Sequence, residues 1–419
     1  MELNEREALK IKIGKELKLK TEEMATRQEM LELLKEFDDY ILEYPEELSG
    51  YGNRSVVLEA LGLYQLALND LNVVTHMSPN LHRGWLNKAL IMLRLGRLRE
   101  GWQYYEWRRG MVIDNNDFPK NHREIALPYW NGEKNTENSK LFIYAEQGLG
   151  DNIQFFRFIL ELKDRGIHIS VLNKVELDSL LRYNLEKNDI EIFENGAKLT
   201  PEFKYYAFLM SLPHCLQIDN IDKIPYKSKY IDVPPQFEEK WKKKLRATKK
   251  KKIGIFWTSD SEHKKSRFRN VSFEKIRKLF SLDAKFHCLQ KNVSEEDRQA
   301  GEKVKNLYFW DTELEDFSDT AALISQMDLV ITVDTSVAHL AGALGKPTWI
   351  MLAYHPDFRW LLDREDSPWY DSVRLFRQDE DYQWDSLDDN DHIIIYFYPK
   401  PKESHEYYIP SMGETVASY

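Results

Sequence analysis

The stretch DLVITVDTSVAHLAGALGKP, residues 328–347, decides the fold of this chain. Its first part, residues 328–333, is a short β-branched apolar run, which is typical of a buried parallel strand. The polar residues 334–336 follow at once and are good helix N-cap residues. Residues 337–344 place small and apolar side chains at helical spacing, and a second apolar run at 348–352 predicts the next strand.

A strand, a tight polar turn and a short helix form half of a doubly wound α/β domain. Ligands of such sheets bind at the carboxyl ends of the strands, where the free N–H groups of a helix face an anion. We therefore expect Thr335 and Ser336 to lie where a diphosphate binds, with Asp334 beside the group that the phosphate carries. Taken alone, the turn favours an ordinary capped βα unit without a ligand, so the wider sequence has to decide.

Two longer runs do so. The segment VDTSVAHLAGALGKP resembles the donor-binding loop of heptosyltransferase-like glycosyltransferases, which have the two-lobed GT-B fold. The run DFRWLLDREDSPWYDSVRLFRQ, residues 357–378, is similar to superfamily members that carry tetratricopeptide (TPR) repeats ahead of the transferase. This resemblance, over about residues 50–384, implies helical repeats followed by a GT-B core of two Rossmann-like lobes. It adds Val337 and His339 to the donor-binding residues.

Composition limits the alternatives. The chain has 419 residues, 42% hydrophobic and 31% charged, so it has room for two or three domains of a globular protein. We see no apolar run long enough for a membrane span and no signal-peptide core at the N-terminus. Cys215 and Cys288 stand far apart, which disfavours a disulfide framework or zinc site and predicts a reducing cytoplasm. A net charge of −10 argues against nucleic-acid binding.

A repeat precedes the α/β part. Pro45 and Pro79 are 34 residues apart, as are Gly62 and Gly96, which is the period of TPR repeats. We expect residues 1–110 to form TPR-like helical repeats that dock on the next domain. They could bind a protein or peptide acceptor, or only make the enzyme rigid, because a repeat signature predicts a fold and not a ligand.

A glycine loop, EQGLGD at residues 146–151, follows the first strand of the first lobe. Gly148 and Gly150 let a ligand come close to the backbone. The loop lacks the third glycine of a dinucleotide fingerprint, because Ile153 takes that place, and this disfavours a dehydrogenase.

Asp151, at the end of this loop, is by default a helix cap. The resemblance implies that it is the catalytic base, which takes the proton of the acceptor hydroxyl as the new bond forms. The resemblance also makes Gln147, Gly148 and Gly150 the acceptor-side loop.

The second lobe contributes a basic loop. Thr258 follows its first strand, and the run HKKSRFRN at residues 263–270 comes next. In the related family the corresponding loop binds the donor phosphates, and Arg269 is the best match to its cation, ahead of Lys265 and Arg267. Without the family, the run is equally typical of a basic surface loop.

Gln290 and Lys291, at the end of a later strand, are expected to approach the nucleotide. The helix start at Asp319 and Thr320 resembles the family's donor-side helix cap, which can meet the ribose or base. Fixed cations and helix N–H groups can stabilise a departing nucleotide in place of a metal ion. We therefore expect no metal and no cofactor, with the nucleotide sugar as a substrate.

A cluster after the donor loop holds Arg359, Trp360, Arg364, Asp366 and Trp369. Charged groups and indoles so close together predict a packed, hydrogen-bonded connection between the lobes. We interpret these residues as structural rather than catalytic.

The predicted division is therefore TPR-like repeats (1–110), a linker (111–139), an acceptor lobe (140–235), a donor lobe (236–384) and a C-terminal tail (385–419). Relatives end with a helix that crosses back over the first lobe. This tail instead reads as a strand and a proline-containing segment.

The predicted function is that of a cytoplasmic glycosyltransferase that moves a sugar from a nucleotide-sugar donor to a protein or surface-glycan acceptor. The resemblance implies inversion at the anomeric carbon. The alternative is a non-catalytic TPR adaptor with a degenerate nucleotide-binding core.

Overall fold

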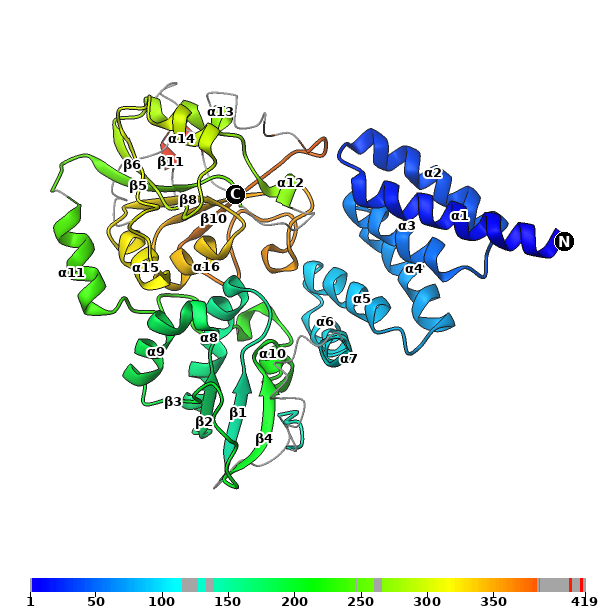
Figure 1. The fold of residues 1–419 in the computed structure, drawn as a ribbon, viewed down its shortest axis with the longest axis horizontal. Helices are drawn as coiled ribbons and strands as arrows, with labels where there is room; N and C mark the ends of the chain where they lie inside the picture. Colours follow the sequence, from blue (N-terminus) through cyan, green and yellow to red (C-terminus); the bar gives the residue numbers. More distant parts are fainter. Residues whose placement is uncertain are drawn as a thin grey trace.

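The structure is a computed structural model. It describes residues 2–114, 127–132, 139–245, 247–259, 266–382, 384, 407–408 and 415–416. Figure 1 shows a helical N-terminal region that lies beside two α/β lobes. The predicted architecture, helices followed by two Rossmann-like lobes, is confirmed.

The N-terminal region consists of paired antiparallel helices. These are α1 (Glu2–Glu23), α2 (Arg27–Glu43), α3 (Leu48–Ala60), α4 (Tyr64–Met77), α5 (His82–Arg94), α6 (Leu98–Tyr105) and α7 (Arg108–Asp114). The last of them, α7, runs across the boundary that we predicted at residue 110.

The 34-residue spacing of the sequence recurs in these helices. Helices α3 and α5 begin at Leu48 and His82, 34 residues apart. Gly62 and Gly96 follow the two helices with φ of 76° and 75°, the left-handed conformation that favours glycine after a helix end. The glycines therefore recur because each hairpin needs the same turn. Assignment of the hairpins to the TPR class stays a prediction.

The first lobe is a four-stranded parallel sheet in the order β3-β2-β1-β4. Its strands are β1 (Lys140–Tyr144), β2 (Ile169–Leu172), β3 (Glu191–Ile192) and β4 (Phe203–Phe208), with helices α8 (Leu149–Asp164), α9 (Asp178–Lys187) and α10 (Leu212–Cys215). The predicted linker takes part in this lobe, because Trp130 N–H donates to the carbonyl of Tyr206 in β4 at 2.8 Å.

The second lobe is a six-stranded parallel sheet in the order β10-β9-β8-β5-β6-β7. Its strands are β5 (Lys251–Phe256), β6 (Ala284–Cys288), β7 (Leu307–Tyr308), β8 (Leu329–Val333), β9 (Thr348–Leu352) and β10 (Val373–Arg377). Its helices are α11 (Pro235–Lys244), α12 (Ser266–Arg269), α13 (Phe273–Ile276), α14 (Glu295–Gly301), α15 (Phe317–Ser325) and α16 (Ser336–Ala343).

The strand order places the ligand crevice. The chain leaves the centre of the second sheet in one direction through β5, β6 and β7 and in the other through β8, β9 and β10. The switch point therefore lies between β5 and β8, which pair in parallel. In open α/β sheets ligands bind outside the carboxyl ends of the strands at such a point. All five residues of β8 are buried, as its apolar sequence predicts.

The two lobes meet through α8 of the first and α16 of the second, whose N-termini lie side by side (Figure 1). Gly150 allows this approach. A Cβ atom at Gly150 would lie 2.9 Å from Cδ2 of His339 and 3.3 Å from Cα of Ser336. The contact brings the predicted acceptor-side loop against the predicted donor loop.

The strand predicted within the tail, at residues 393–398, lies outside the described residues. Of the tail, the structure describes the short antiparallel pair β11 (Tyr407–Tyr408) and β12 (Thr415–Val416). Within the described part of the chain, we find no helix with the length and apolar character that crossing a membrane requires.

Candidate active site

A cavity of about 810 Å³ lies at the switch point, where the N-termini of α8 and α16 face each other. Its lining comes from both lobes, and ten of the residues predicted from the sequence take part in it. These are Gly148, Gly150, Asp151, Thr258, Arg269, Asp334, Thr335, Ser336, Val337 and His339.

The N-terminus of α16 faces the cavity without a side-chain cap from its N-cap residue. Thr335 is the N-cap residue, and the structure shows no side-chain cap among the described residues. The N–H groups of Ser336 and Val337 precede the first bond that closes a helical turn, in which Ala338 N–H donates to the Thr335 carbonyl at 3.0 Å. They therefore add partial positive charge to the wall of the cavity.

Asp334, just before this helix, is buried. Nη1 of Arg269 donates to its backbone carbonyl at 3.0 Å, which brings the predicted phosphate-binding cation to the end of β8. Burial and the negative charge of Asp357 raise the pKa of Asp334 to about 6. Although burial opposes it, the Arg359 guanidinium lowers the pKa of Asp357. The cavity thus holds two neighbouring carboxyl groups whose pKa values are pushed apart.

Asp151 lies in the first turn of α8, on the other side of the cavity. Its Oδ2 accepts a hydrogen bond from Gly148 N–H at 2.7 Å, which caps the helix. Its Oδ1 forms an ion pair with Nη2 of Arg359. Each carboxylate oxygen has a second lone pair, so Asp151 can still accept a hydrogen bond from a hydroxyl group in the cavity. The default cap and the predicted base are therefore compatible in one side chain.

Arg359 lines the cavity and forms the hydrogen-bonded connection between the lobes that its sequence cluster predicted. Its Nε donates to Oε1 of Gln154 at 2.6 Å, and its Nη1 donates to Oδ1 of Asp357 at 2.7 Å. One guanidinium thus connects carboxylates from both lobes. Its position soon after β9, whose carboxyl end lies at the same edge of the sheet as those of β5 and β8, was the signal that could have identified it as a lining residue.

His339 lies at the back of the cavity. Its Nδ1 is 2.9 Å from the hydroxyl of Tyr370, and its ring stacks on Trp360 at 5.2 Å. Burial, reinforced by the positive charge of Arg359, lowers the pKa of His339 to about 3. His339 is therefore neutral near pH 7 and holds the helix against the interlobe segment.

Two predicted residues lie away from the cavity. Gln290 is buried behind the end of β5, where its Oε1 accepts hydrogen bonds from Trp257 N–H at 2.9 Å and Thr258 N–H at 3.3 Å. It shapes the strand end that carries Thr258. Gln147 is exposed, with a positive φ of 63°, and precedes the two glycines at the turn.

The remaining wall includes Lys291, which the sequence predicted near the nucleotide and which donates through Nζ to the Glu315 carbonyl at 2.7 Å. Sequence reasoning missed the apolar part of this wall. The apolar part is formed by Phe256, Leu289 and Phe317. These residues are also at or just beyond strand ends or in the first turn of a helix, so the strand-end rule could have found them.

Other predicted positions have different surroundings. Thr320 lines the cavity, but Asp319 is buried and accepts hydrogen bonds from Nζ of Lys240 at 2.7 Å and Nε1 of Trp241 at 2.8 Å. Asp319 therefore holds α11 against α15. Lys265 and the side chain of Arg267 lie outside the described residues.

Comparisons with known proteins found similarity in sequence and in structure. Protein FlbA of Caulobacter vibrioides is 26% identical over 376 residues, which cover 83% of this chain and 61% of the relative. The chain thus spans about three fifths of that relative's length. Among solved structures, the chain is similar to a family 9 glycosyl transferase from Veillonella parvula, with a TM-score of 0.45 and 11% identity over 59% of this chain and 88% of the other.

A second solved structure is the ADP-heptose LPS heptosyltransferase II of E. coli, with a TM-score of 0.37 and 12% identity over 57% of this chain and 90% of the other. Residues 223–386, which hold most of the second lobe and the donor side of the cavity, match the model of the family described as glycosyltransferase family 9 (heptosyltransferase). The chain therefore contains a glycosyltransferase family 9 domain.

Proposed function

We propose that this chain is a glycosyltransferase that moves a sugar from a nucleotide-sugar donor to a hydroxyl group of an acceptor. One observation carries the proposal: an uncapped helix N-terminus on the donor lobe faces the carboxylate of Asp151 on the acceptor lobe across one cavity. An anion site opposite a proton acceptor is the arrangement that transfer from a diphosphate leaving group requires.

The donor diphosphate would bind at α16. The N–H groups of Ser336 and Val337 would donate hydrogen bonds to the phosphate oxygens, and Arg269 and Lys291 would add positive charge. The apolar residues on the same wall offer a surface for the nucleotide base. Asp334 would hydrogen-bond the sugar, because it directly precedes the phosphate-binding turn.

Asp151 would act as the base. The acceptor oxygen attacks the anomeric carbon, the bond from that carbon to the phosphate oxygen breaks, and the hydroxyl proton passes to Asp151. The leaving nucleotide keeps the bonding electrons, and the charge that develops on it lies against α16 and Arg269. Attack from the side opposite the leaving group inverts the configuration of the sugar.

The cations and N–H groups on the donor side can perform the stabilisation that a metal ion performs in other transferases. We therefore propose a metal-independent reaction, which predicts full activity in the presence of a chelator. The proposed compartment is the cytoplasm, in keeping with two cysteines that are free and buried.

The test is a thermal-unfolding screen of the full chain with ADP-, UDP-, GDP- and CMP-linked sugars, including ADP-heptose, with and without chelator. A donor at a hundredfold excess over its dissociation constant adds about 2.7 kcal/mol of stability. Arg269→Ala should remove most of that gain, whereas Arg277→Ala, an exposed arginine away from the cavity, should keep it. If a folded sample responds to no nucleotide or nucleotide sugar, the adaptor alternative replaces the enzyme.

A further inference from the structure

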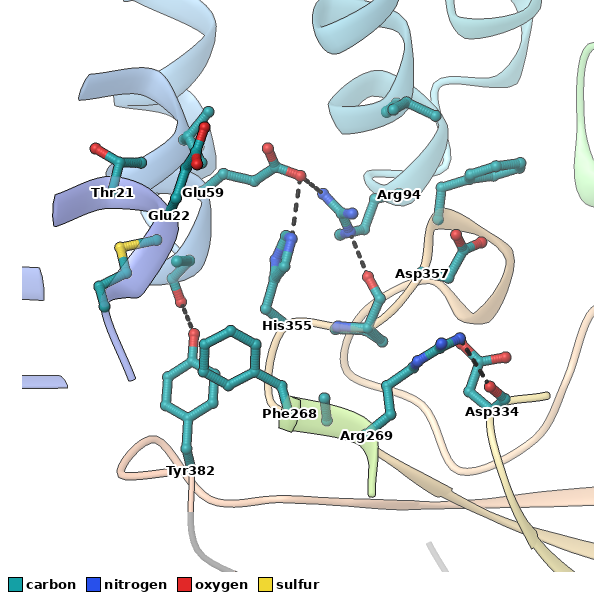
Figure 2. Close-up of a pocket in the computed structure, with 17 residues that line it drawn as sticks. Thr21, Glu22, Glu59, Arg94, Phe268, Arg269, Asp334, His355, Asp357 and Tyr382 are labelled. Carbon is teal, nitrogen blue, oxygen red and sulfur yellow. Dashed lines mark hydrogen bonds and ion pairs between the residues drawn. The ribbon is translucent and has the colours of Figure 1, made fainter. Parts of the chain in front are cut away.

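A second cavity, of about 510 Å³, lies between the helical region and the donor lobe. Figure 2 shows its walls, which come from α1, α3 and α5 on one side and from α12 and the segment after β9 on the other. This cavity exists only because the N-terminal helices dock on the second lobe.

The second cavity adjoins the candidate active site. Arg269, Asp334 and Asp357 line both. Asp357 and the proposed base, Asp151, are held by the same Arg359 guanidinium. A molecule that occupies the second cavity therefore lies next to the groups at which the transfer would take place.

The polar groups of its walls largely engage one another, as the dashed lines in Figure 2 show. Oε1 of Glu59 accepts from Nη1 of Arg94 at 2.7 Å and pairs with Nε2 of His355 at 3.1 Å. Nε of Arg94 donates to the Pro356 carbonyl at 2.8 Å. These bonds fasten α3 and α5 to the segment that carries Asp357.

The surface that remains for a ligand is mainly apolar. It includes Met24, Val56, Leu90, Phe268 and Phe358. A sugar chain is a poor match for such walls, because each hydroxyl that it buries needs a hydrogen-bond partner. An apolar side chain is a good match, because its burial needs no hydrogen-bond partner.

We propose that the second cavity binds an apolar side chain of a polypeptide acceptor and so places the neighbouring serine or threonine hydroxyl beside Asp151. This inference rests on the proposed transferase function and specifies the acceptor as a polypeptide. The helical region would then contribute to acceptor selection through the wall that it shares with the donor lobe.

The test uses fluorescein-labelled nine-residue peptides with one central serine or threonine, whose neighbours are either leucine and phenylalanine or asparagine and glutamine. Fluorescence anisotropy with the full chain measures binding in the presence and absence of the donor from the nucleotide-sugar screen. Burial of one large apolar side chain predicts that the apolar peptides bind at least about tenfold more tightly than the polar peptides.

Val56→Trp and Leu90→Trp fill the cavity from two different helices, and each should remove that preference. Leu66→Trp is the matched control, because Leu66 is half exposed on α4 and outside the lining of both cavities. Each variant is first checked for unchanged thermal unfolding and unchanged donor binding. Two filling variants keep the test valid if one of them fails to fold.

The outcomes separate the two proposals. No nucleotide-sugar binding by the wild-type chain overturns the transferase function itself. Two outcomes would overturn the acceptor cavity alone. In the first, the wild-type chain binds the donor but binds both peptide sets with equal affinity. In the second, the preference for apolar peptides survives in both filled variants. Loss of donor affinity in the filled variants assigns the cavity to the donor and also overturns the inference.

Discussion

The N-termini of α8 and α16 face the same cavity, but the chain treats them in opposite ways. The N-cap residue of α8 makes no side-chain cap, but the first turn of this helix carries an acid, Asp151, whose Oδ2 accepts a hydrogen bond from Gly148 N–H. At α16 the described residues place no side-chain cap, so the N–H groups remain for an external anion. In the proposed function the two termini therefore have different roles: the terminus with the acid presents the base, and the terminus without an acid in its first turn binds the diphosphate.

Arg359 adds a further difference between the N-termini of α8 and α16. It belongs to the donor lobe but pairs with Asp151 of the acceptor lobe. The base is therefore oriented by two bonds, one from its own loop and one from the opposite lobe. We expect relative movement of the lobes to change the environment of Asp151 more than that of Thr335 or Ser336.

The largest expected effect comes from Asp151, in the first turn of α8. Asp151→Asn keeps an oxygen that can accept from Gly148 but removes the proton acceptor, so the transfer rate should fall by about 10²–10⁴-fold with donor affinity unchanged. Steady-state kinetics with the donor from the screen provides the measurement. Asp178→Asn, which alters a first-turn acid of α9, is the control. An unchanged transfer rate in the Asp151→Asn variant would mean that Asp151 is not the catalytic base.

The next effect is on stability. Arg359→Met leaves Asp151 and Asp357 without their shared cation in a mostly buried place and should lower the free energy of unfolding by about 3–5 kcal/mol. Arg364→Met breaks a pair with the exposed Asp366 and should cost no more than about 1 kcal/mol. Denaturant unfolding compares the two. Equal losses would mean that Arg359 does not connect the lobes.

The raised pKa of Asp334 gives a pH-dependent difference. A carboxyl group whose pKa is raised on folding stabilises the fold fully at pH values below its pKa in the unfolded chain, which is near 3.8. That contribution is lost as the pH rises through the pKa of the folded state, about 6. Asp334→Asn should therefore be more stable than the wild type above pH 6, by up to about 3 kcal/mol, and equally stable below pH 4. Thermal unfolding across this range provides the measurement, and a gain that does not vary with pH contradicts the assignment.

The smallest effect concerns the turn before α8. Gln147 adopts a positive φ, which strains a residue with a Cβ atom, whereas glycine adopts it freely. Gln147→Gly should raise stability by less than about 1 kcal/mol and leave donor binding unchanged. Gln299→Gly, within α14, should instead lower stability by about 1 kcal/mol. A change in the donor affinity of the Gln147→Gly variant would mean that Gln147 takes part in the binding site.

The sequence predicted most of the donor side because its signals are local. An apolar run, three cap residues and a small-residue helix lie in one stretch, and the predicted strand at 348–352 matches β9 at both ends. The 34-residue spacing of Gly62 and Gly96 likewise matches the spacing of helices α3 and α5 in the structure. In each case neighbours along the chain determine the structure.

Contacts across the molecule were not accessible in this way. The neighbours of Arg359 predicted a connection between the lobes, but its partner Asp151 is 208 residues away, and the pairing of the two depends on how the lobes close. Gln290 stands at a strand end like the true lining residues, but its side chain turns back to the N–H groups of Trp257 and Thr258. The second cavity depends on the docking of two regions, which no single motif describes.

The measurement that tests the role of the N-terminus of α16 most directly is donor affinity in Ser336→Pro. Proline at the first position of a helix is tolerated and removes one N–H group, and the extended backbone of Thr335 suits a following proline. Glu295→Pro makes the same change at the first position of α14, outside the cavity lining. Loss of a hydrogen bond to a charged phosphate predicts donor binding weaker by about tenfold or more for Ser336→Pro alone, with both variants folded. Donor binding by Ser336→Pro as tight as that of the wild type would contradict the claim that α16 holds the diphosphate.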